Sequence, residues 1–132
     1  MKKIQGQSTS NASSVSQAAA VVALNGIHEP VHSMTREYER RHKFIFAALN
    51  EIRGFKIVEA TGAFYTFPEV ITAIEYLNLT DDIEFSDYLL ERAQFAVVPG
   101  TAFGAKGHIR LSFATSMELL KEAVNRIEDM LN

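Results

Sequence analysis

The sequence predicts an α+β fold, a small sheet of about four strands with helices packed on one face. Apolar residues recur at helical spacing in several stretches, and short apolar runs of strand length lie between these stretches. Helices and strands alternate irregularly along the chain, without an internal repeat. The length of 132 residues suits a single domain.

Two helices are expected to precede the sheet. Residues 4–12 are small and polar, which predicts a loop. Residues 14–25 begin with a hydroxyl side chain followed three residues later by Gln, and Gly26 provides a C-terminal stop. Pro30 suits the entry to a second helix at about 31–53, which has an apolar stripe and a charged face. The first helix is rich in alanine, so we expect it to pack closely against another surface.

The strands are expected in the second half of the chain. Residues 55–59 and 63–67 read as short strands joined by a turn. Residues 95–98 are continuously apolar, as in a buried central strand, whereas residues 109–113 alternate between apolar and polar. Residues 69–80 are ambiguous, because a turn or two of helix is compatible with them but not required.

Two further helices have N-terminal signals. Asp81 and Glu84 form a capping pattern before a helix at about 83–93. Thr115 and Glu118 form another capping box before the final helix, whose apolar residues recur at helical spacing up to the end of the chain.

Composition excludes several classes of function. A net charge of −3 gives no electrostatic reason to expect a nucleic-acid partner. The chain has no cysteine, which excludes disulfides and thiolate metal sites and fits a cytoplasmic protein. No apolar run approaches the ~20 residues of a membrane span. His28 and His32 are four residues apart, but Pro30 lies between them, so no metal site is expected.

Arg110 is the candidate binding residue. It lies on the polar face of the strand at 109–113, where a planar guanidinium is suited to a carboxylate or phosphate. The same pattern is compatible with an arginine that is solvated or paired with a neighbouring acid.

Several segments together resemble a known family. Residues 99–104 (PGTAFG) and 109–116 (IRLSFATS) resemble the C-terminal part of fold-type I, pyridoxal-phosphate-dependent aminotransferases, in particular the aspartate aminotransferase-like class I/II group. Residues 62–65 (GAFY) resemble a second family signature and residues 7–11 (QSTSN) a third. The resemblance extends from about residue 4 to the C-terminus.

This resemblance implies an arrangement of domains. Residues 1–29 would be the tail end of a large domain, comprising a loop and a helix. Residues 30–53 would be the linking helix, and residues 54–132 would be the aminotransferase small domain. The two leading helices would then connect to a large domain that lies upstream of this chain.

The resemblance also implies roles for individual residues. Arg110 matches the arginine that binds the α-carboxylate of the substrate. Thr9 and Asn11 belong to a loop that approaches the active site across the dimer interface, although a plain polar loop is an equal alternative. Gly62 and Phe64 would lie at the active-site rim, although packing is the ordinary role of an aromatic residue in a strand.

The implied activity is transamination between an amino acid, aspartate for this group, and a 2-oxo acid such as 2-oxoglutarate. Pyridoxal phosphate would be the cofactor of the full-length enzyme, a cytoplasmic homodimer. No lysine of this chain lies in the Ser/Thr-x-x-Lys context of the family. We therefore expect this chain to contribute no catalytic residue, and to be inactive and without cofactor by itself.

Two alternatives remain open at this stage. The parent enzyme could have alanine, aromatic or kynurenine specificity. The chain could also be a free-standing α+β binding or interaction module without catalysis. The fragment interpretation predicts that the leading helices are exposed or covered by a second copy of the chain.

Overall fold

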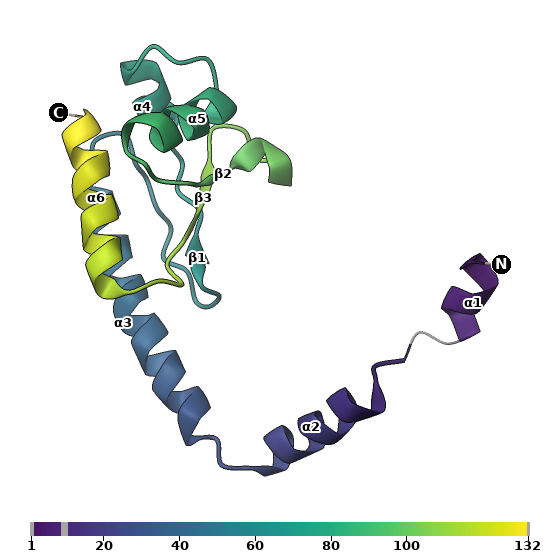
Figure 1. Cartoon of the computed structure of the whole chain (residues 1–132). Helices are drawn as coiled ribbons and strands as arrows, with labels where there is room; N and C mark the ends of the chain where they lie inside the picture. The colour runs from purple at the N-terminus through teal and green to yellow at the C-terminus, as the bar shows by residue number, and fades with distance from the viewer. Residues whose placement is uncertain (1, 9–10, 132) are drawn as a thin grey trace. The chain divides into compact units, whose positions relative to one another are not determined.

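The computed structural model describes residues 2–8 and 11–131, in two compact units, Met1–Met34 and Thr35–Asn132 (Figure 1). The fold class is α+β, as predicted. The elements in chain order are α1 (Lys2–Ser8), α2 (Ser14–Asn25), α3 (Glu29–Glu51), β1 (Tyr65–Thr66), α4 (Ile71–Tyr76), α5 (Asp82–Arg92), β2 (Val98–Pro99), the 3-10 helix η1 (Gly100–Phe103), β3 (Ile109–Ser112) and α6 (Met117–Leu131).

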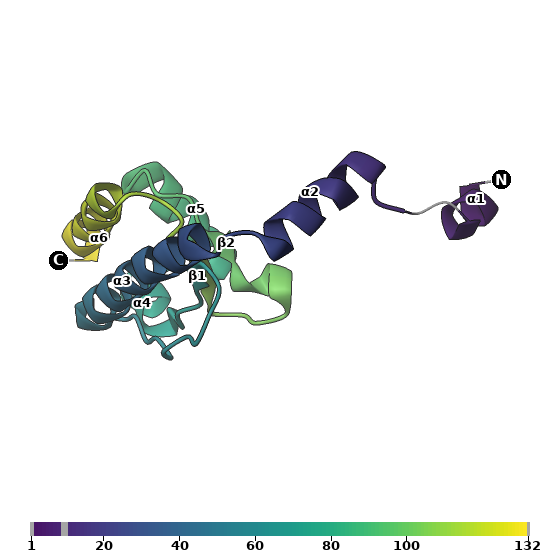
Figure 2. The same cartoon turned by 90° about the horizontal axis from the view of Figure 1, so that it is seen from below.

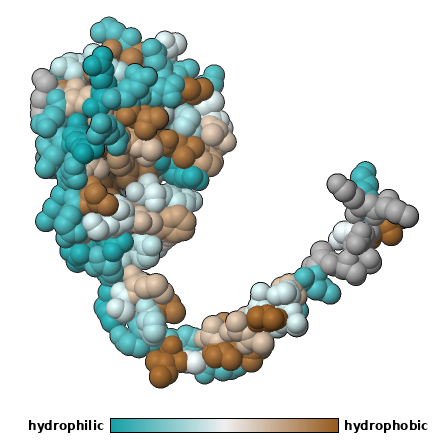
Figure 3. Space-filling view, in the orientation of Figure 1, coloured by the Kyte–Doolittle hydropathy of each residue, from teal (hydrophilic) through white to brown (hydrophobic). Residues whose placement is uncertain are grey.

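The first unit contains two short helices. The prediction of a loop over 4–12 was wrong for its first part, because α1 extends to Ser8. Lys and Gln are good helix formers, and their propensity outweighs the glycine in the middle of this segment. The cap of α2 is one residue earlier than the capping pattern at Ser14 predicts, because the Ser13 hydroxyl accepts a hydrogen bond from the Ser16 N–H at 3.3 Å. Every residue of α2 is exposed, and its apolar side chains are visible on the surface (Figure 3).

The long helix α3 leads into the second unit. Its buried residues, Ile45 and Leu49, lie near its C-terminal end. Ion pairs one turn apart, such as Glu39 with Lys43, occupy its exposed face. The chain leaves this helix through Gly54, which has a φ of +86° and packs against the backbone of Ala73.

The sheet has three strands in the order β1-β3-β2, with both pairs antiparallel. The expected fourth strand at 55–59 was wrong. Lys56 and Glu69 exchange backbone hydrogen bonds of 3.0 and 2.9 Å, but the next N–H, that of Ile57, bonds to the Asn50 side chain instead of a strand. The Lys56–Glu69 pair is therefore an isolated bridge, and no β-strand forms over residues 55–59.

The central strand is also different from the prediction. Residues 95–98 were expected to form it, but β2 contains only Val98 of that run and lies at an edge of the sheet. The start of the run belongs to the turn that leaves α5, in which Gln94 has a φ of +51° and the Phe95 N–H bonds to the Leu89 carbonyl. The central strand is β3.

The remaining helices cover the sheet. The ambiguous segment 69–80 contains the short helix α4, and α5 is capped by Asp81, as predicted. The cap of α6 is one residue later than expected, because the Ser116 hydroxyl, not that of Thr115, accepts from the Leu119 N–H at 3.3 Å. The helix α6 lies beside the C-terminal half of α3 (Figures 1 and 2).

One hydrophobic core joins these elements. Ile109 and Leu111 of β3 are fully buried, and α3, α4, α5 and α6 contribute side chains to the same cluster. The strand therefore presents one face to the helices and leaves its other face, which carries Arg110, outside the core. Within the described residues, no helix is long and apolar enough to cross a membrane.

Candidate functional site

Arg110 is held in the middle of the best-buried strand. Its neighbours Ile109 and Leu111 are both 0% exposed, whereas Arg110 itself is half-buried on the opposite face. Arg110 pairs with Val98 of β2, so strands support its backbone from both sides of β3. The position of the guanidinium is therefore set by a rigid element.

Two aromatic rings flank the Arg110 guanidinium. Its Cζ atom lies 4.7 Å from the ring centroid of Phe103 and 5.5 Å from that of Tyr65. Tyr65 is supplied by β1 and Phe103 by η1, the turn that follows β2. The rings attract the cation through their π faces and restrict its movement.

The same face carries two more stacked rings. Phe67 lies two residues after Tyr65, and His108 lies two residues before Arg110. Because side chains alternate along a strand, the side chains of these four residues lie on the same face of the sheet. Phe67 stacks on His108 with centroids 5.3 Å apart and meets Phe103 edge-on at 6.0 Å. Arg110 therefore projects from a surface made mainly of rings.

Arg110 forms no ion pair with an acidic side chain among the described residues. In the part of the chain that the structure describes, no carboxylate lies within 4.0 Å of its guanidinium nitrogens. By contrast, Arg40 and Arg41 both pair with Glu37, whose pKa they lower to about 2. A half-buried, unpaired guanidinium with a planar fork of donors is suited to an external carboxylate or phosphate.

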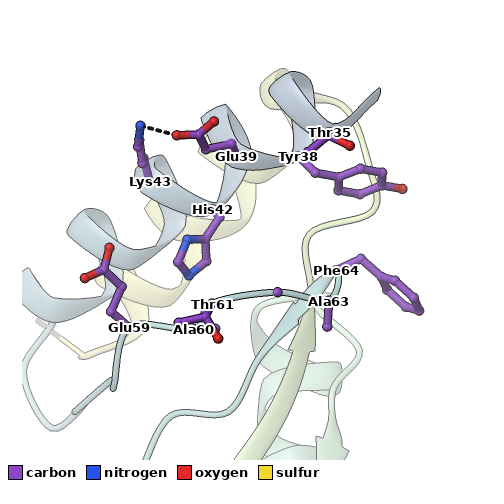
Figure 4. A pocket seen from close by; sticks show the side chains of 11 residues that line it. Thr35, Tyr38, Glu39, His42, Lys43, Glu59, Ala60, Thr61, Ala63 and Phe64 are labelled. Atoms are coloured by element: carbon purple, nitrogen blue, oxygen red, sulfur yellow. Dashed lines mark hydrogen bonds and ion pairs between the residues drawn. The ribbon is translucent and has the colours of Figure 1, made fainter. Parts of the chain in front are cut away.

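Phe64 and Gly62 lie next to this face. The Phe64 ring is 53% exposed and meets Tyr65 edge-on, with centroids 5.8 Å apart. Tyr65 therefore contacts both Phe64 and Arg110. Phe64 and Gly62 also line a hollow of about 830 Å³ between α3 and residues 59–64 (Figure 4).

The structure does not test the two other predicted residues, Asn11 and Thr9. Asn11 is exposed and belongs to the first unit. Thr9 lies outside the described residues. The proposed loop role of both stays a prediction.

Two of the residues that surround Arg110, Tyr65 and Phe103, are not predicted from the sequence. Packing is the ordinary role of an aromatic strand residue such as Tyr65, but its alternation with Phe67 places it on the polar face of the sheet. Phe103 belongs to the segment 99–104 that carries the family resemblance, but this loop has neither helical nor strand periodicity, so no local pattern places its ring beside Arg110. Only the folded loop brings this ring to the strand.

The described residues do not by themselves fit the cofactor that the resemblance implies. Pyridoxal phosphate needs a lysine that loses its proton and forms an imine, which desolvation or a nearby cation favours. The described lysine side chains are all exposed. Lys43, which lines the hollow, is hydrogen-bonded to Glu39 at 2.5 Å, and this bond raises its pKa (Figure 4).

The structure also offers no metal centre within the residues it describes, where no cluster of three or more His, Asp and Glu side chains could hold an ion. What the site can do chemically is bind an anion in a fixed orientation.

Known proteins have a similar sequence and a similar fold. The family model for aminotransferase class I and II matches residues 1–127. The chain is 46% identical to an aspartate/prephenate aminotransferase of Nitrosomonas europaea, over 100% of this chain and 35% of that protein. It is 43% identical to an aspartate aminotransferase of Bacillus subtilis, over 97% of this chain and 33% of that protein.

A solved structure agrees with these relatives. The aspartate aminotransferase of Rhizobium meliloti superposes with a TM-score of 0.83 at 40% identity, covering 97% of this chain and 33% of that one. The chain thus spans about a third of the length of its relatives. This chain belongs to the class I and II aminotransferase family.

Proposed function

We propose that this chain supplies the substrate-binding arginine of a pyridoxal-phosphate-dependent aminotransferase that transfers an amino group between aspartate and a 2-oxo acid. The observation that carries the proposal is Arg110 itself. It is fixed on the central strand, flanked by Phe103 and Tyr65, and without an acidic partner among the described residues.

The role of Arg110 in this proposal is orientation. Every amino-acid and 2-oxo-acid substrate carries an α-carboxylate, and a bidentate pair with a guanidinium fixes both its position and its plane. Holding a reactant in the productive geometry can contribute several kcal/mol to the reduction of a barrier. The aromatic neighbours keep the guanidinium in one place, so that little order has to be gained when the substrate binds.

Aspartate as the substrate is supported by the names of the relatives. Both the Nitrosomonas europaea and the Bacillus subtilis proteins are named for aspartate, and so is the Rhizobium meliloti structure. The printed contacts of the Arg110 guanidinium are with the rings of Phe103 and Tyr65, and neither ring would pair with a side-chain carboxylate. In our proposal, residues outside this chain supply the cation that pairs with the side-chain carboxylate of aspartate, and also the lysine that binds the cofactor. The complete enzyme in this proposal is a cytoplasmic homodimer.

The test uses a chimera in which this chain replaces the matching third of the Bacillus subtilis aspartate aminotransferase. Arg110→Lys replaces a planar fork by a point charge and removes one charge-assisted hydrogen bond. Such a bond contributes about 1.5–3 kcal/mol, so kcat/KM for aspartate is expected to fall about tenfold to hundredfold, with a sharp rise in KM. Steady-state kinetics with aspartate and 2-oxoglutarate measure both parameters.

The matched control is Arg53→Lys. Arg53 also lies over an aromatic ring, with its Cζ atom 4.1 Å from the centroid of Tyr76, but it belongs to the turn after α3. This substitution is expected to leave kcat and KM unchanged. Unaltered kinetics in Arg110→Lys would refute the assigned role, and so would a folded, cofactor-bound chimera without transaminase activity.

A further inference from the structure

A buried carboxylate lies behind the loop that carries Phe103. Asp82 is 0% exposed, although it occupies the first turn of α5, where charged residues are normally solvated. It does not cap its own helix, because the neighbouring Asp81 accepts the hydrogen bonds from the Ile83 and Glu84 N–H groups. The Asp82 carboxylate is therefore available for another part of the chain.

Asp82 binds both ends of the loop between β2 and β3. One carboxylate oxygen accepts the Thr101 N–H at 2.7 Å. The other accepts the Thr101 hydroxyl at 2.9 Å and the Gly107 N–H at 3.1 Å. Burial raises the pKa of Asp82, but these hydrogen bonds together lower it below its ordinary value, so the group is charged at neutral pH.

The loop that Asp82 holds contains Phe103, whose ring contacts Arg110. Phe103 ends η1, which begins next to Thr101, and the loop is closed by a 2.7 Å hydrogen bond from the Gly100 N–H to the His108 carbonyl. The Phe103 ring is 50% exposed, so core packing alone does not fix it. Its position over Arg110 depends on the backbone of the loop.

We propose that Asp82 is a positioning residue for Arg110, acting through the loop 100–107 and the Phe103 ring. This inference rests on the proposed function in so far as Arg110 binds the substrate carboxylate. A buried carboxylate with three convergent donors holds a loop more firmly than neutral bonds would, because charge-assisted hydrogen bonds are about twice as strong. The loop therefore offers a preformed wall to the guanidinium.

Asp82→Asn is the principal variant. An amide provides one oxygen and two N–H donors where the loop presents three donors, so at least one buried N–H of the loop faces another donor. Thr101→Val is the milder variant, since it removes only the hydroxyl bond and keeps both backbone bonds. Phe103→Leu removes the ring and leaves Asp82 intact.

Asp81→Ala is the matched control. It removes the cap of the same helix and so weakens that helix, without touching the loop. An effect of Asp82 that merely reflected a weaker α5 would appear in this variant as well.

The first readout is made on the 132-residue chain and does not depend on catalysis. The Nε–Hε signal of Arg110 in a ¹H–¹⁵N spectrum, identified by its loss in Arg110→Lys, is shifted by the rings that flank it. In Asp82→Asn this signal is expected to move toward its position in Phe103→Leu, and in Thr101→Val it moves part of the way. In Asp81→Ala it stays in place.

The second readout is kinetic and uses the Bacillus subtilis chimera. A misplaced carboxylate ligand is expected to raise KM for aspartate about tenfold to hundredfold in Asp82→Asn, with a smaller change in kcat, because a displacement of about 1 Å can have effects of this size. Asp81→Ala is expected to retain the KM of the unmodified chimera.

The outcomes separate the two proposals. An Arg110 signal that shifts in Asp82→Asn while KM does not change supports positioning by Asp82 but overturns Arg110 as the carboxylate ligand. A raised KM in Arg110→Lys, together with an unmoved Arg110 signal in Asp82→Asn, overturns the role of Asp82 and leaves the function intact. If Asp82→Asn does not fold, the Arg110 Nε–Hε signal is compared in Thr101→Val and Phe103→Leu instead. An unmoved Arg110 signal in both variants overturns the inference.

Discussion

Replacing Gly100 by alanine tests whether close packing of the backbone holds the loop beside Arg110. A Cβ atom at Gly100 would lie 2.7 Å from the His108 carbonyl oxygen and 2.8 Å from the His108 Cβ, and it would also meet the Ala105 carbonyl oxygen. Ordinary contact requires about 3.5 Å, so the backbone must open by roughly 1 Å. Gly100 is buried, so no nearby solvent takes up this displacement.

The energetic cost follows from the hydrogen bonds that such an opening breaks. The Gly100 N–H bonds to the His108 carbonyl at 2.7 Å, and the Ala105 N–H bonds to the Gly100 carbonyl at 3.0 Å. Leaving each buried group unpaired costs about 1–3 kcal/mol, and the lower entropy of the unfolded alanine chain offsets about 0.4–1 kcal/mol. We expect Gly100→Ala to lower the free energy of unfolding by about 2–4 kcal/mol.

Urea unfolding followed by the near-ultraviolet circular dichroism of the tyrosine and phenylalanine side chains measures this change. Two glycines provide controls. Gly62→Ala meets no atom within 4 Å and has no positive φ, so it is expected to be neutral or slightly stabilising. Gly104→Ala also has open space but a φ of +76°, and is expected to cost about 1–2 kcal/mol. A Gly100 variant as stable as the Gly62 variant would refute the packing argument.

Two further predictions concern charged groups. Because hydrogen bonds lower the pKa of Asp82 in the folded chain, its contribution to stability is present above the pKa of an unfolded aspartate and is lost as the pH falls through the folded pKa. The difference in urea midpoint between the unmodified chain and Asp82→Asn should therefore shrink below about pH 4, and a constant difference down to pH 2 would contradict it. Pyridoxal phosphate followed by borohydride should label the described lysines slowly and without one dominant site, because their side chains are all exposed and Glu39 raises the pKa of Lys43, the one that lines the hollow. Stoichiometric labelling of one lysine in a peptide map would show that the chain has a cofactor site of its own.

Regular periodicity predicted most of the fold. The alternation in residues 109–113 placed Arg110 opposite the core, and capping patterns located α2 and α5. These signals are local, so each can be read from a window of ten or so residues. The family resemblance of the same segments then indicated the carboxylate role that we propose for Arg110.

The errors have a common physical origin in tertiary hydrogen bonding. Residues 55–59 have strand composition, but the Asn50 side chain takes the N–H that a ladder would need. Residues 95–98 are apolar enough for a central strand, but the turn that leaves α5 uses the first of them. Asp82 reads as a helix-start residue, and nothing local shows that its partners are Thr101 and Gly107. Competition between partners distant in sequence decides such cases.

The alternation of core and non-core side chains along β3 has a consequence for which positions of the Arg110 face can be substituted. The odd positions Ile109 and Leu111 belong to the core, and the even positions His108, Arg110 and Ser112 do not. His108 and Arg110 are half-buried and Ser112 is exposed, so substitutions at these positions remove less buried volume than substitutions at Ile109 or Leu111. A combinatorial library restricted to the even positions would therefore vary the anion site that we propose at less risk to folding than one that includes the core positions, with the backbone of the sheet as a constant frame.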